Sequence, residues 1–223
     1  MFRKLFGSKV FGSKEQPDHE SRPASPEIMG LYLGGSFELD PLKLKLIEPQ
    51  LKINGAAHKH LIQAVGKIAL DTGGTMFRFY TDDDAFLQVV TDGGESENHI
   101  TDVKLWYFYD TKTVGSQSQW SQLISSGISK PQYDLDGDSY YRVWDAIGEE
   151  SPPVAMTETT YEQDGDTSTT DQFIMLYERD LGNDNVEALL VAGEEKIVDN
   201  NHDRCLVIST GFDVSPADIT ING

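Results

Sequence analysis

Three aspartates at alternate positions have the spacing that comes closest to a metal site in this chain. Asp134, Asp136 and Asp138 match the first three oxygen positions of a helix–loop–helix calcium loop, and Asp145 falls at the twelfth. That loop needs glycine at its sixth position, where this chain has Ser139, and no helical pattern flanks the segment. The sequence therefore favours an acidic turn, and we predict no metal centre.

Two histidines and one cysteine are the other candidates for chemistry. On a strand, His58 and His60 would share a face and could both ligate a metal, but no third ligand is identifiable. Cys205 is the single cysteine and lies in an apolar run, where a thiol usually packs as a small hydrophobe. Phosphate-binding loops and a Gly-x-Ser-x-Gly elbow are absent from the sequence. We therefore predict no catalytic residues and no cofactor, and an enzyme is disfavoured.

The charge distribution limits the classes of partner. The chain has 18 basic and 37 acidic residues, a net charge of −19. Four of the basic residues lie within the first 14 positions, where there is no acid, which leaves 14 basic against 37 acidic residues in the remainder. Such a body repels phosphate backbones and disfavours nucleic acid as a partner, whereas polyamines, metal cations or a basic protein would be attracted. Simple solubility is the alternative explanation.

The N-terminal segment combines cations with large apolar side chains. Phe2, Leu5 and Phe6 would share one face of a helical turn, a pattern that suits an anionic membrane surface or an acidic partner. A disordered tail is the alternative. Residues 15–29 carry three prolines and read as a linker, so we divide the chain into a tail and linker at 1–29 and one acidic β-rich domain at 30–223. The candidate membrane- or partner-binding residues are Phe2, Arg3, Lys4, Leu5, Phe6 and Lys9.

Targeting signals are missing from the sequence. No apolar run approaches the ~18 residues of a membrane span, and the N-terminus lacks the apolar core of a secretory signal. We therefore expect a cytoplasmic protein that could be peripheral at the inner membrane.

Residues 75–94 give the strongest structural pattern. Apolar and polar residues alternate on both sides of the turn-forming run 81–84, which predicts an antiparallel hairpin. Phe77, Phe79, Leu87 and Val89 would form one buried face. The opposite face carries Arg78 and either meets solvent or is itself covered.

The rest of the chain reads as further strands with one helix. A strand is favoured after Pro41 because Lys43 and Lys45 alternate with leucines, and a second hairpin is expected from 154–162 and 172–178. Ser116 and Gln119 fit a capping box before a helix near 117–126. Aromatic clusters at 106–109 and 140–144 favour core packing, with sugar or polyamine stacking as the alternative. The predicted fold is mainly β (α+β): a large, mostly antiparallel sheet arranged as a sandwich or partly closed barrel.

Several strings resemble one bacterial family. The string GLYLGGSFELD at residues 30–40 and the segments 77–89, 102–105 and 189–195 are similar to parts of the YjfK-like bacterial proteins, and so is the short tail at 2–6. That family has no known function, so the resemblance implies no activity and no catalytic residues. It does point to a PspA-like membrane-remodelling protein as a partner.

Two functional hypotheses follow. The first is a non-catalytic accessory protein that acts at the inner face of the membrane with a PspA-like partner, and it is favoured by the basic tail and acidic body. The second is an enzyme or carrier for a cationic metabolite such as a polyamine. A deep pocket lined by carboxylates and aromatic side chains would favour the second hypothesis.

Overall fold

The computed structural model describes residues 24–53, 55–144, 149–183, 185–199 and 201–222. Its helices are two short α-helices, α1 (Pro41–Ile47) and α2 (Gln117–Gln122), and α2 continues into a π-helical turn, Leu123–Gly127. The strands are β1 (Ser36–Leu39), β2 (Lys59–Ala69), β3 (Thr75–Thr81), β4 (Ala85–Thr91), β5 (Ile100–Thr113), β6 (Gln132–Leu135), β7 (Asp138–Arg142), β8 (Val154–Glu162), β9 (Thr167–Gly182), β10 (Asn185–Val198), β11 (Asn201–Asp213) and β12 (Ile219–Asn222).

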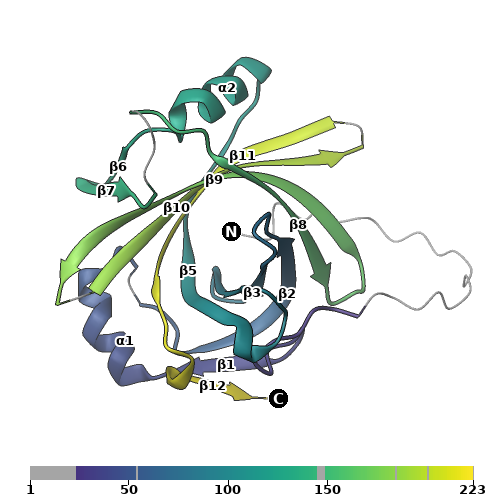
Figure 1. The fold of residues 1–223 in the computed structure, drawn as a ribbon, viewed down its shortest axis with the longest axis vertical. Helices are drawn as coiled ribbons and strands as arrows, with labels where there is room; N and C mark the ends of the chain where they lie inside the picture. The colour runs from purple at the N-terminus through teal and green to yellow at the C-terminus, as the bar shows by residue number, and fades with distance from the viewer. Residues whose placement is uncertain (1–23, 54, 145–148, 184, 200, 223) are drawn as a thin grey trace, which may run out of the picture.

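The twelve strands form one antiparallel sheet that closes on itself in part. Its order is β12-β1-β2-β3-β4-β5-β11-β10-β9-β7-β6. Strand β8 lies off this path and pairs with both β2 and β9, which joins eight strands into a ring. Figure 1 shows the ring strands surrounding the middle of the molecule. The predicted mainly β fold is confirmed, and the pairing of β8 shows that the sheet is partly closed.

The predicted central hairpin is present as β3 and β4. Phe79 lies opposite Leu87 and Phe77 opposite Val89, and all four side chains are buried. Asp84 has a φ of 48°, a conformation that aspartate adopts more readily than most residues, and it completes the turn. The register and the buried face were therefore predicted correctly.

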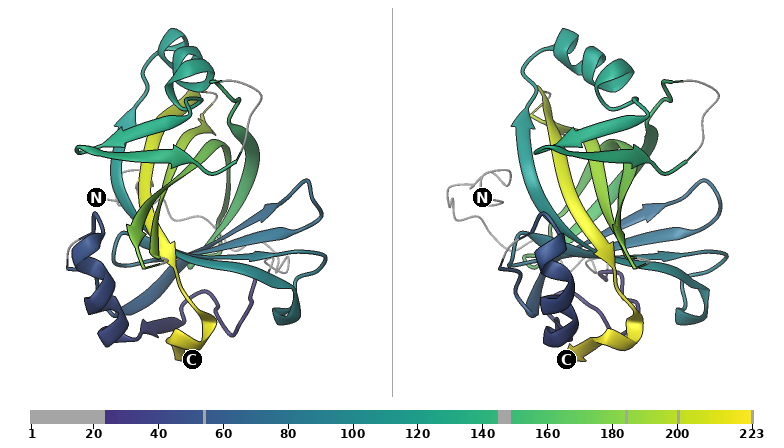
Figure 2. Two further views of the ribbon diagram at one scale, coloured as in Figure 1. Left: turned by 60° about the vertical axis from the view of Figure 1, so that its left-hand side comes forward. Right: turned by 90° about the vertical axis from the view of Figure 1, so that its left-hand side faces the viewer.

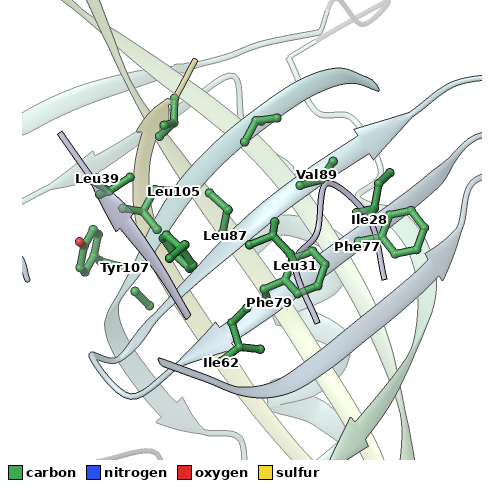
Figure 3. Close-up of a cluster of buried hydrophobic side chains, with 14 of the residues drawn as sticks. Ile28, Leu31, Leu39, Ile62, Phe77, Phe79, Leu87, Val89, Leu105 and Tyr107 are labelled. Atoms are coloured by element: carbon green, nitrogen blue, oxygen red, sulfur yellow. The ribbon is translucent and has the colours of Figure 1, made fainter. Parts of the chain in front are cut away.

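A covering segment from the N-terminal part of the chain packs on that buried face. Leu31, Phe37 and Leu44 contribute to the same cluster as the β3–β4 side chains. Figure 3 shows Ile28 and Leu31 beside Phe77 and Phe79. Ile28 is 5% exposed, so the core already includes a residue just ahead of Gly30.

A second cover lies on the outer face of β9, β10 and β11. The segment after α2 and the hairpin β6–β7 bury Ile128, Leu135 and Tyr140 against Met175 and Leu189. In Figure 2 this hairpin and α2 lie on the same side of those strands. Large parts of the ring are thus covered from outside, and its inner face is enclosed by the strands themselves.

Residues 41–47 form helix α1, so the prediction of a strand after Pro41 was wrong. Asp40 caps the helix by accepting from the backbone N–H groups of Leu42 at 2.8 Å and Lys43 at 3.3 Å. Pro41 occupies the first helical turn, where a missing N–H costs nothing. The Leu/Lys alternation misled because only Leu44 is buried.

The predicted helix near 117–126 is confirmed, with Ser116 accepting from the N–H of Gln119 at 3.2 Å.

Candidate functional site

A cavity of about 950 Å³ lies inside the ring and is lined by residues of all eight ring strands. On β10 the lining residues are Leu190, Ala192, Glu194 and Lys196, one at every second position. Because successive side chains of a strand point to opposite faces, these four follow the inner face from one end of the ring towards the other. The volume is within the range of small-molecule sites.

One wall of the cavity is aromatic. Tyr80 contacts both Phe86, with ring centroids 5.4 Å apart, and Phe108, at 6.4 Å. Phe86 and Phe108 are 5.3 Å apart, so the three rings form one continuous surface. Leu190 and Val207 extend the apolar part of the lining.

A buried ion pair joins β3 to β8 over β2, the strand that lies between them in the ring. Arg78 is 2% exposed and Glu158 1% exposed, and Arg78 Nη1 donates to Glu158 Oε2 at 3.0 Å. The guanidinium group also lies over the Phe86 ring, with Cζ 5.3 Å from the centroid. Within the described residues, Arg78 Nη2 has no hydrogen-bond partner. The Arg78 side chain is therefore buried inside the ring. Because Phe77 and Phe79 are buried on the opposite face, β3 is buried on both faces at this point.

Hydrogen bonds tie this ion pair to Tyr80 on β3 and to two further strands, β4 and β9. Tyr80 donates its hydroxyl proton to Glu158 Oε1 at 2.7 Å, and Gln172 Nε2 donates to Glu158 Oε2 at 2.9 Å. Arg78 also donates to Gln172 Oε1 at 2.8 Å and to Gln88 Oε1 at 3.2 Å. Burial, and then the adjacent Glu158 carboxylate, raise the pKa of Tyr80 well above its ordinary value, so its phenol stays protonated as a donor. Every carboxylate oxygen of Glu158 is thus occupied.

Gly66 on β2 makes room for this network. A Cβ atom at position 66 would lie 1.7 Å from Glu158 Oε1 and 3.2 Å from Tyr80 Cε2. Any larger residue would therefore have to displace the Glu158 carboxylate.

Glu194 is the inner carboxylate that remains accessible. It lines the cavity, keeps part of its surface exposed, and accepts one hydrogen bond from Gln172 Nε2 at 3.2 Å. Within the part of the chain that the structure describes, no lysine or arginine forms an ion pair with it. Desolvation, and then the negative charge of Glu158, raise the pKa of Glu194 to about 7, while Arg78 opposes the shift. Glu194 is therefore partly protonated near neutral pH.

The outer part of the lining is also acidic. Glu162, Asp164 and Asp203 line the cavity near the β8–β9 and β10–β11 turns, and Lys196 is the cation there. Cys205 lies opposite Glu194 on β11, and burial raises the pKa of its thiol to about 12. The thiol is thus protonated, and it packs in the apolar cluster with Val207 as expected.

The aspartates of the acidic turn do not converge. Asp134 accepts from Gln132 at 2.8 Å and Ser139 at 2.7 Å, Asp136 accepts from the Tyr109 hydroxyl, and Asp138 pairs with Lys52 at 2.5 Å. Asp145 lies outside the described residues. Across the residues that can be described, no three His, Cys, Asp or Glu side chains group as a metal site would.

The other sequence-predicted candidates are dispersed. His60 is buried and stacks on Phe37 with ring centroids 4.8 Å apart, whereas His58 is exposed. Of the aromatic cluster at 106–109, Trp106 is core and Phe108 lines the cavity. The tail candidates from Phe2 to Lys9 lie outside the described residues.

A second buried carboxylate, Glu187, is a structural contrast to Glu194. Its Oε1 accepts from the backbone N–H of Lys52 at 2.6 Å, and its Oε2 accepts from Tyr140 at 2.7 Å and Arg179 at 2.6 Å. Glu187 is 0% exposed and fully occupied, so it fixes the segment after α1 to β9 and β10.

Sequence reasoning missed the cavity residues because their only signal was polar side chains inside strands: Arg78, Glu158, Gln172 and Glu194.

Comparisons with known proteins identify the family. In the described ranges no helix has the length and apolar character needed to cross a membrane. No solved structure matches the chain. The chain is 31% identical over 199 residues to the "Uncharacterized protein YjfK" of Escherichia coli K12, and the match covers 87% of each chain. A family model described as "Protein of unknown function (DUF2491)" matches residues 1–220. The chain therefore belongs to the DUF2491 family, as its resemblance to the YjfK-like proteins implied.

Proposed function

We propose that this protein is a non-catalytic binding protein that holds a small organic cation inside the ring of strands. The observation that carries the proposal is the cavity of about 950 Å³, whose lining contains five carboxylates and two cationic side chains. This pocket supports the carrier of a cationic metabolite, such as a polyamine, which the sequence had ranked second.

The charges of the lining favour a cation. Arg78 and Glu158 neutralise each other in the buried ion pair. The remaining cation, Lys196, faces a larger number of carboxylates, and a cleft with low-dielectric walls concentrates their field on a ligand. The carboxylates left after the ion pair are Glu162, Asp164, Glu194 and Asp203.

The aromatic wall suits the same class of ligand. An ammonium group is attracted to the face of an aromatic ring, and Tyr80, Phe86 and Phe108 offer adjoining rings along the cavity. Leu190 and Val207 could pack against methylene groups. An aliphatic amine combines both properties in one molecule.

Calorimetry with three linear probes of equal chain length tests the proposal: an aliphatic diamine, the corresponding diol and the corresponding dicarboxylate. We expect the diamine to bind at least about tenfold more tightly than either of the others, a difference of about 1.4 kcal/mol. Spermidine should also bind. Equal affinity for all three probes, or preference for the dicarboxylate, would reject a cation site.

Two neighbouring threonines on β9 provide the matched control. Thr170 is half-buried and lines the cavity, whereas Thr169 is exposed and does not. Thr170→Trp should fill part of the cavity and weaken diamine binding about tenfold or more, while Thr169→Trp should leave it unchanged. Unchanged binding in both variants would place the diamine elsewhere on the protein.

We also propose that the tail brings the protein to the inner membrane surface, where a PspA-like partner could cluster several copies. Each cation near an anionic surface contributes about 1 kcal/mol. The proline-rich stretch ahead of Ile28, which the sequence predicts to be a linker, would hold the tail farther from the acidic body than the ~8 Å Debye length, so the body need not approach the lipid. This supports a cytoplasmic protein that is peripheral at the membrane.

Vesicle co-sedimentation tests this second proposal. The full chain should pellet weakly and in a salt-sensitive manner with anionic vesicles, and a truncated chain beginning at Glu27 should not. Replacing Phe2, Leu5 and Phe6 with serine should also abolish pelleting, because the apolar side chains would no longer insert. If full-length and truncated chains pellet equally, the tail does not mediate membrane contact.

A further inference from the structure

We propose that Glu194 is the carboxylate that receives the cationic group of the ligand, and that it gives up a bound proton when the cation arrives. The inference rests on the proposed function, since it assigns a residue and a proton exchange to the same cavity.

The geometry distinguishes Glu194 from Glu158. Glu158 is 1% exposed, and both of its oxygens already accept hydrogen bonds from Tyr80, Gln172 and Arg78. A ligand could reach it only by breaking that network. Among the described residues, Glu194 accepts a single hydrogen bond, from Gln172 Nε2, and it keeps accessible surface on the cavity side. It is therefore the inner carboxylate that has capacity for another donor.

The charged and titratable groups around Glu194 come from several strands of the ring. Gln172 on β9 is uncharged, and Arg78 on β3 remains a cation within its ion pair with Glu158 on β8. Cys205 on β11 faces Glu194 across the strand pair, and burial raises the pKa of its thiol to about 12. Tyr80 on β3 is a protonated phenol, and Lys196 lies two positions along β10. Glu162, Asp164 and Asp203 line the outer part of the same cavity, and desolvation raises the pKa of Glu162 above its ordinary value.

The proton exchange follows from the electrostatics of the enclosed site. Desolvation and the charge of Glu158 raise the pKa of Glu194 to about 7, so near pH 6 the empty cavity holds mostly the neutral acid. An ammonium group beside Glu194 replaces the missing counter-charge and favours the carboxylate. The acid then releases its O–H proton to solvent, and an ammonium–carboxylate pair takes its place. The ligand keeps its own protons, because an aliphatic ammonium has a pKa of about 10.4.

The pH dependence has a defined sign. Below the pKa of the empty site, the cation must displace a proton, so affinity rises with pH; above it, the carboxylate is already ionised and affinity levels off. For a pKa of about 7, the ionised fraction grows from roughly one tenth at pH 6 to roughly nine tenths at pH 8. The dissociation constant for the diamine should therefore fall about tenfold over this range.

Calorimetry of the full chain with the aliphatic diamine, in two buffers of different ionisation enthalpy, measures the proton released. We expect about 0.9 proton per bound diamine at pH 6 and about 0.1 at pH 8. Glu194→Gln should lose the proton release and weaken binding at pH 8. Glu195→Gln is the matched control, because Glu195 pairs with Arg204 at 2.5 Å and does not line the cavity; it should retain both.

The outcomes separate this inference from the proposed function. Diamine binding that is blocked by Thr170→Trp but releases no proton at pH 6 would overturn the role of Glu194 and leave the cation site intact. Proton release that persists in Glu194→Gln would assign the exchange to another carboxylate and also overturn the inference. Absence of diamine binding at both pH values would remove the proposed function as well.

Discussion

Arg78→Met should lower the free energy of unfolding by about 3–5 kcal/mol, because it would leave Glu158 buried without its cation. Both side chains of the pair are almost fully enclosed, at 3% and 2% exposure. The substitution also removes the donors to Gln88 and Gln172, which would leave two buried amides partly unsatisfied. Urea denaturation monitored by tryptophan fluorescence at neutral pH measures the change.

Two controls identify the cause of this loss. The double variant Arg78→Met, Glu158→Gln should recover much of the stability, because no unpaired charge remains. Lys112→Met removes one partner of an ion pair with Asp110 that is 64% and 40% exposed, so it should cost no more than about 1 kcal/mol. A loss of that small size for Arg78→Met as well would mean that water enters the ring and solvates Glu158.

The sequence predicted the hairpin that carries Arg78 but left the burial of Arg78 open. Period-2 alternation identifies which residues share a face, so Phe77 and Phe79 could be placed together. Alternation says nothing about what covers the opposite face. Two of the partners of Arg78, Glu158 and Gln172, come from β8 and β9, 80 and 94 positions further along the chain. The requirement for glycine at position 66 is likewise visible only once β8 pairs with β2.

The two α-helices differ in how well local sequence signals predicted them. The helix after Ser116 could be predicted because its cap and its buried Trp120 are both local signals. Helix α1 has equally local signals in Asp40 and Pro41, but Leu42 and Leu46 are 66% and 68% exposed. Exposed leucines produced an alternating pattern that favoured a strand. Capping residues were the better guide for this seven-residue segment.

The cavity could not be predicted from composition. Thirty-seven acidic residues give no basis for selecting Glu194 until the ring places it opposite Cys205 and beside Gln172. The sequence signal for Glu194 was its position inside β10, directly after the run Leu189–Gly193, which has no charged residue. Polar residues on the inner face of a strand could have been flagged as candidates, because buried charges need a partner or a function.

Phe79→Ala should cost about 3–5 kcal/mol of unfolding free energy, because Phe79 is 0% exposed and its removal leaves a void that the covering segment cannot fill. Phe108→Ala is a matched control with the same change in side chain. Phe108 is half-buried and already borders the cavity, so its truncation enlarges an existing space and should cost clearly less. Urea denaturation of the two variants under identical conditions gives the comparison.

Equal losses of unfolding free energy in the two variants would show that the ring interior is as tightly packed as the outer core. That result would argue against an open cavity and therefore against a ligand inside the ring. A small loss for Phe79→Ala alone would instead mean that the register of β3 differs by one residue, since such a shift exchanges the two faces of the strand.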